Sequence, residues 1–86
     1  MEEYDYMEKL IEILSDIRPD LDFYKEDRLV DDSIIDSFDI ITAVSEINET
    51  FSVGINIADL IPENLNSATS MWDLIIRHKQ KKGAMN

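Results

Sequence analysis

The sequence predicts an all-α fold, a small four-helix bundle of three main helices and one short helix, with a long loop between the first and second helices. In three segments the apolar residues recur at three- and four-residue steps, which is typical of amphipathic helices. No segment shows a convincing alternation of apolar and polar residues, the mark of a half-buried strand. The length of 86 residues corresponds to one small domain.

The first helix is expected from about Glu3 to Ile17. Pro19 stops it, because the residue before a proline is pushed away from helical angles. Its apolar face consists of Met7, Leu10, Ile11, Leu14 and Ile17. Ile13 lies beside this face, and we expect it to be partly buried.

Residues 18–36 form the long loop, which exceeds the length that a compact domain usually leaves unstructured. Such a loop needs apolar anchors that dock into the bundle. The sequence offers Leu21, Phe23, Leu29, Val30, Ile34 and Ile35. The loop delivers the chain directly to Ser37.

The second helix is expected from Ser37 to about Thr50. Asp36 can be its N-cap, because a carboxylate there accepts hydrogen bonds from backbone N–H groups of the first turn. Asp39 adds a second negative charge near the positive end of the helix dipole. Gly54 is available for the left-handed turn that follows many helices. The apolar residues of this segment are Ile40, Ile41, Val44, Ile47 and Phe51.

Residues 57–61 predict a short helix or helical turn, closed by Pro62. Asn66 or Ser67 is expected to cap the final helix. The apolar face of that helix contains Ala68, Met71, Trp72 and Ile75, and its basic end contains Arg77, Lys79, Lys81 and Lys82. Positive charge suits the C-terminal end of a helix dipole. We expect one domain over residues 1–82 and a frayed tail over residues 83–86.

The chain is strongly acidic, with a formal net charge of −11. Residues 1–76 contain 19 acidic residues against four basic ones, because the other four Lys and Arg lie in the last ten positions. Nucleic-acid binding is therefore not expected, since it depends on Lys and Arg contacts to phosphates. The acidic surface either steers basic partners toward the protein or is a solvated face that keeps it soluble.

Enzyme and metal chemistry are not expected. His78, the single histidine, is predicted in an exposed basic helix end, which lacks the partner and the pocket that a general base needs. Asp20, Asp22, Asp31 and Asp32 do not have the spacing of an EF-hand loop. The chain has no cysteine, an acidic N-terminal segment and no apolar run long enough to span a bilayer. We therefore expect a soluble, cytoplasmic monomer that does not insert into membranes.

Ser37 is the candidate functional residue. At the first position of the second helix its hydroxyl should face solvent and lie close to free backbone N–H groups. Such helix N-termini favour phosphate. A serine in this position is well placed to carry a phosphodiester.

The segment from Asp36 to Ile41, which reads Asp-Ser-Phe-Asp-Ile-Ile, together with Phe51, resembles the attachment site of the acyl carrier protein family, usually Asp-Ser-Leu-Asp. The resemblance implies that 4'-phosphopantetheine from coenzyme A is attached to Ser37, with Asp36 beside it. Its thiol would carry acyl groups as thioesters in fatty-acid or related acyl biosynthesis. Ser33 follows Asp32 and superficially repeats the signature, but only Ser37 precedes an uninterrupted helical period.

The resemblance also implies partners. These are a phosphopantetheinyl transferase, and acyl-transferring, ligase or synthase enzymes with basic docking patches. Asp39, Glu46 and Glu49 would meet those patches from the second helix. Phe38 and Ile41 flank Ser37 and are expected to be apolar partner contacts.

Three departures from the family pattern leave the cargo open. Thr42 and Asn48 are uncharged where glutamate is common in fatty-acid carriers, and Phe38 replaces the usual leucine. One alternative is a carrier for a dedicated ligase of the D-alanyl or aminoacyl type, and another is a carrier from a polyketide or peptide pathway. A non-carrier alternative is a small acidic helical module that binds a basic protein.

Overall fold

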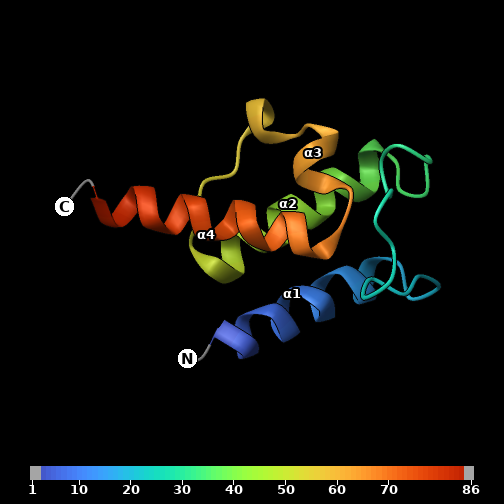
Figure 1. The fold of residues 1–86 in the computed structure, drawn as a ribbon, viewed down its shortest axis with the longest axis horizontal. Helices are drawn as coiled ribbons and strands as arrows, with labels where there is room; N and C mark the ends of the chain where they lie inside the picture. Colours follow the sequence, from blue (N-terminus) through green and yellow to red (C-terminus); the bar gives the residue numbers. More distant parts are fainter. Residues whose placement is uncertain (1–2, 85–86) are drawn as a thin grey trace.

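The computed structural model describes the backbone of residues 3–84 and the side chains of residues 6–80. Within residues 3–84 it contains helices and no strand. The helices are α1 (Glu3–Ile17), α2 (Ser37–Phe51), the 3-10 helix η1 (Ile57–Asp59), α3 (Pro62–Leu65) and α4 (Ala68–Ala84). Helix α1 runs opposite to α2 and α4 and packs against both, while α3 packs on α4 (Figure 1). The predicted all-α bundle is confirmed.

The core lies between α1, α2 and α4. Three rings of Tyr6, Phe51 and Trp72 meet at one end of it, with centroids 5.8–6.0 Å apart. Ile13, which was expected to be partly buried, belongs to the buried core. The predicted faces of α1 and α4 are correct, because Leu10, Ile11, Leu14, Ala68, Met71, Trp72 and Ile75 are all buried.

The long loop between α1 and α2 is packed, as predicted. Phe23, Leu29 and Ile35 are buried, and the other expected anchors are half-buried against the core. Asn66 fixes the middle of the loop, because its side-chain Oδ1 accepts from the backbone N–H groups of Val30 and Asp31 at 3.0 Å. Its own backbone carbonyl accepts from the N–H of Leu29.

The sequence predicted either Asn66 or Ser67 as the cap of α4, and the structure shows that the cap is Ser67. The Ser67 hydroxyl accepts from the backbone N–H of Ser70, and the Ser70 hydroxyl accepts from the backbone N–H of Ser67. These reciprocal bonds resemble a capping box with serine in place of the usual glutamate. Asn66 is thereby left to hold the loop.

Two predicted helix ends are wrong. The left-handed residue after α2 is Ser52, with φ 55°, while Gly54 does not have a positive φ. Pro62 does not close a helix, because it is the first residue of α3, a position where a missing N–H costs nothing. The short helical turn predicted at 57–61 is present as η1 over its first three residues.

The C-terminal part of the structure is α4, which extends to Ala84. The fraying expected over residues 83–86 stays a prediction, and residues 85–86 lie outside the described part. Lys79 lies in the basic end of α4, but its Nζ donates to the carbonyl of Phe51 on α2 at 2.8 Å. It therefore caps the C-terminal end of α2. None of the helices in residues 3–84 is long and apolar enough to cross a membrane.

Candidate functional site

The N-terminus of α2 is built by a reciprocal capping box. The Asp36 carboxylate accepts from the backbone N–H of Asp39 at 2.9 Å, and the Asp39 carboxylate accepts from the backbone N–H of Asp36 at 3.4 Å. The prediction of Asp36 as N-cap is confirmed. Such a box fixes the direction in which the first turn begins.

Ser37 is the first residue of α2 and is exposed. Its backbone N–H and that of Phe38 have no acceptor among the residues that the structure describes. An exposed hydroxyl beside two unpaired N–H groups at a helix start is compatible with an attached phosphate. Ser33 differs, because it lies in the loop with φ 56° and no helix follows it directly.

Asp39 is bound within the protein rather than projecting toward a partner. Its Oδ2 lies 3.1 Å from Nη1 of Arg18, and its side chain is 20% exposed. Because the same carboxylate completes the capping box, Asp39 is a structural part of the site. The predicted role of Asp39 as a docking acid requires a free side chain. This side chain is instead held by Arg18 and by the capping box.

Arg18 joins three segments at this point. Its Nη1 also donates to the carbonyl of Ile34, and its Nε and Nη2 donate to the two carboxylate oxygens of Asp20. These bonds, first to Asp20 and then to Asp39, raise the pKa of the Arg18 guanidinium. In turn Arg18 lowers the pKa of Asp20. The end of α1, the end of the loop and the start of α2 are thereby tied together.

An apolar patch lies beside Ser37. Phe38 is 69% exposed and Ile41 is 64% exposed, although both lie in a helix whose other apolar side chains face the core. Exposed apolar residues that lie next to each other on a helix are candidate partner contacts. Their placement fits the apolar contacts predicted from the sequence.

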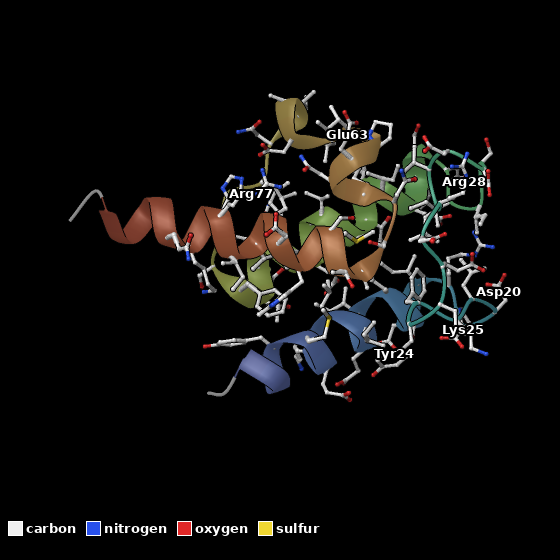
Figure 2. All side chains as sticks on the ribbon, in the orientation of Figure 1. Asp20, Tyr24, Lys25, Arg28, Glu63 and Arg77 are labelled. Atoms are coloured by element: carbon white, nitrogen blue, oxygen red, sulfur yellow. The ribbon has the colours of Figure 1, made fainter. Side chains whose placement is uncertain are left out.

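Acidic residues continue along α2. Glu46 and Glu49 are exposed and have no ion pair with any side chain of residues 6–80. The sequence contains no Lys, Arg or His between Arg28 and Arg77. Figure 2 shows Arg28 at the end of the molecule that the loop forms, and Arg77 on α4. The acidic residues on the surface of α2 therefore have no basic residue within α2 or the segments next to it to offset their charge.

His78 is not in the exposed position that was predicted. It is half-buried, and its Nε2 lies 2.9 Å from Oδ2 of Asp59, which joins α4 to η1. The backbone N–H of Asn56 hydrogen-bonds to the same carboxylate. The pKa of Asp59 lies below its ordinary value, mainly because of this hydrogen bond from Asn56 and secondly because of His78. The Asp59–His78 pair therefore has a structural role, because it holds η1 against α4.

Beneath the α2 N-terminus lies an apolar cavity of about 20 Å³, which is space for roughly one water molecule. Arg18 and Asp39 are the charged residues that line it. Ile17, Ile40 and Val44 also line it and are themselves partly exposed. The remaining lining residues are Leu14, Phe23, Ile35, Ala43, Ile47, Ile55, Leu65, Met71 and Leu74.

Comparisons of the chain with protein-family models, with curated proteins and with solved structures give no match. Among the described residues no group of three or more His, Cys, Asp or Glu could hold a metal ion. The sequence predicted Asp36 as the N-cap and the exposed Phe38 and Ile41, but not the reciprocal bond of Asp39 or the role of Arg18. Arg18 has one local signal, because it is the only basic residue at the end of the apolar face of α1.

Proposed function

We propose that this chain is a freestanding acyl carrier protein, with Ser37 as the attachment residue for 4'-phosphopantetheine. The observation that supports this most is the exposed Ser37 hydroxyl at the first position of α2, fixed by the Asp36 and Asp39 capping box. The thiol of the attached arm would supply the thioester on which acyl groups are carried. The protein itself would not be an enzyme, and we place it in the cytoplasm as a monomer.

The chain's own residues would act in two ways. The unpaired N–H groups of Ser37 and Phe38 would favour the phosphodiester. Glu46 and Glu49 would speed encounter with a phosphopantetheinyl transferase and with basic acyl-transferring, ligase or synthase enzymes. The exposed Phe38 and Ile41 would supply the apolar contact of each short-lived complex.

The modification is a balanced group transfer. The Ser37 hydroxyl oxygen forms a bond to the β-phosphorus of coenzyme A, and the bond between that phosphorus and the bridging oxygen breaks. The leaving group is 3',5'-adenosine bisphosphate, and the hydroxyl proton passes to a base of the transferase. No group of the carrier has to act as that base.

The test is intact mass spectrometry after incubation with coenzyme A and a broad-specificity phosphopantetheinyl transferase. We expect the mass to rise by one phosphopantetheine group in the natural chain and in Ser33→Ala, and to stay unchanged in Ser37→Ala. Modification that survives Ser37→Ala but disappears in Ser33→Ala would overturn the assignment. If the natural chain is not modified by any transferase tested, the carrier proposal fails.

The remaining class is then a small acidic module that binds a basic protein, which the absence of basic residues between Arg28 and Arg77 favours. Within the carrier class, the small cavity and the uncharged Thr42 are compatible with two alternatives to fatty-acid synthesis. These are a dedicated D-alanyl or aminoacyl ligase and a polyketide or peptide pathway. Loading of the modified protein by purified ligases and by fatty-acid enzymes would distinguish them.

A further inference from the structure

The N-cap and the first two residues of α2, Asp36, Ser37 and Phe38, are exposed. The capping box between Asp36 and Asp39 fixes the shape of this turn, because both of its bonds lie within the turn. It does not fix the position of the turn relative to α1. A hydroxyl that has to meet an incoming group needs both, so a further restraint on this turn bears directly on Ser37.

Arg18 supplies that restraint from the end of α1. Its backbone N–H donates to the carbonyl of Leu14 at 3.0 Å, so Arg18 continues the hydrogen bonding of the helix. Its side-chain Nη1 donates to the carbonyl of Ile34 at 2.9 Å and to Oδ2 of Asp39 at 3.1 Å. One nitrogen therefore holds the chain three residues before Ser37 and two residues after it.

The guanidinium of Arg18 is itself held in place. The Asp20 carboxylate accepts from Nε at 3.0 Å and from Nη2 at 2.8 Å, on the edge of the guanidinium that does not contain Nη1. A two-bond contact of this kind fixes the plane of the group. The side chains of Arg18 and Asp39 are 29% and 20% exposed, so water competes less for their bond than at an open surface.

We propose that Arg18 is a positioning residue for the modification of Ser37, which places the Ser37 hydroxyl relative to the body of the protein before a transferase binds. This inference rests on the proposed function. Arg18 acts through Ile34 and Asp39 rather than on Ser37 itself, and it takes no part in the bond-forming step. Transfer becomes faster when the reacting hydroxyl is already oriented, because less freedom has to be lost in the complex.

The experiment measures single-turnover modification with coenzyme A and excess transferase in the natural chain, Arg18→Gln and Arg28→Gln. Varying the transferase separates the saturating rate from the concentration that gives half of that rate. Arg28→Gln is the matched control, because Arg28 lies in the same loop and pairs there with Asp31 and Asp32. Both variants remove one positive charge, so they have the same net charge.

Arg18→Gln should lower the saturating rate by about three- to tenfold. This is less than the roughly hundredfold that a 1 Å misplacement can cost, because the capping box remains. The half-saturating concentration should change by less than about twofold, since that quantity reports binding and the docking residues Glu46 and Glu49 are unchanged. Arg28→Gln should match the natural chain in both quantities. A role in global stability alone does not produce this split, because the folded variant would still react at the natural rate.

A second measurement follows the start of α2 in the unmodified protein. NMR relaxation gives backbone order parameters, which report fast motion of each N–H group. Those of Ser37 and Phe38 should fall in Arg18→Gln and stay unchanged in Arg28→Gln. The order parameter of Ile47, which is buried further along α2, should stay the same in both variants.

Equal saturating rates in the natural chain and Arg18→Gln would overturn the positioning role, while Ser37 would remain the attachment residue. So would an equal loss in Arg28→Gln, unchanged order parameters at Ser37, or a rise in half-saturating concentration as the sole effect, which would make Arg18 a docking residue. A natural chain that no transferase modifies would instead overturn the proposed function, and the positioning role with it. The two failures are therefore distinguishable.

Discussion

The side-chain amide of Asn48 forms two hydrogen bonds with the backbone of Ile55, seven residues further along the chain. Its Nδ2 donates to the Ile55 carbonyl at 3.0 Å, and its Oδ1 accepts from the Ile55 N–H at 2.9 Å. Ile55 is buried in the core. Asn48 therefore ties α2 to the segment that follows it, which gives this position a structural reason to be uncharged.

Replacing Asn48 by glutamate should destabilise the protein by about 1–3 kcal/mol, because a carboxylate cannot donate to the Ile55 carbonyl and leaves it unpaired. The free energy of unfolding is measured by urea denaturation. Ser45→Glu, on the exposed side of the same helix, is the control and should change stability by no more than about 0.5 kcal/mol. Equal losses in the two variants would mean that added negative charge, and not the lost hydrogen bond, is responsible. Asn48→Glu is thus a poor test of partner choice.

The turn after α2 favours glycine at position 52 and a residue other than glycine at position 54. Ser52 has φ 55°, so Ser52→Gly should stabilise the protein by about 0.5–1 kcal/mol. Gly54 has no positive φ, and a Cβ added there would meet nothing within 4 Å. Gly54→Ala should therefore also stabilise, by about 0.4–1 kcal/mol, because it restricts the unfolded chain. Thermal and urea unfolding measure both, and a loss of stability in Gly54→Ala would place the left-handed turn at Gly54.

Acid should weaken the bond between η1 and α4 through Asp59. The pKa of this carboxyl is lowered in the folded protein, so its contribution to stability is present above the unfolded pKa and is lost as pH falls through the folded pKa. We expect natural chain and Asp59→Asn to differ most in free energy of unfolding above about pH 5, with the difference shrinking toward pH 2. Urea titrations across this range provide the measurement. A difference that grows on acidification would contradict the assignment.

Charge reversal on α2 tests the docking surface, provided that Ser37 is the attachment residue. Glu46→Lys and Glu49→Lys should each slow transferase modification about two- to fivefold at low salt, since exposed charges contribute modestly to each encounter. The effect should shrink at high salt. Glu12→Lys, an equal charge change on the exposed side of α1, is the control. Asp39→Lys is unsuitable because it would also break the capping box and the pair with Arg18. If Glu12→Lys slows the reaction as much, net charge rather than α2 governs docking.

Short-range features of this protein follow from residues close together in the chain. The apolar periodicity of α1, α2 and α4, the Asp36 cap and the exposed Phe38 and Ile41 were all predictable, because each depends on side chains within one or two helical turns. The ends of the short elements were less predictable. Ser52 rather than Gly54 takes the left-handed conformation because it directly follows Phe51, the last residue of α2, where the chain turns.

Contacts between distant segments were decided by the tertiary structure. The Arg18 guanidinium reaches Asp39, Asn66 holds the loop at Val30, and Lys79 caps Phe51 on another helix. Arginine, asparagine and lysine carry the same local signal whichever acceptor they find, so the sequence alone does not select the partner. The selection depends on how the buried anchors of the 18–36 loop set its path and on how α1 and α4 pack against α2. Only that packing brings Arg18 and Asp39 together over an apolar cavity beside Ser37.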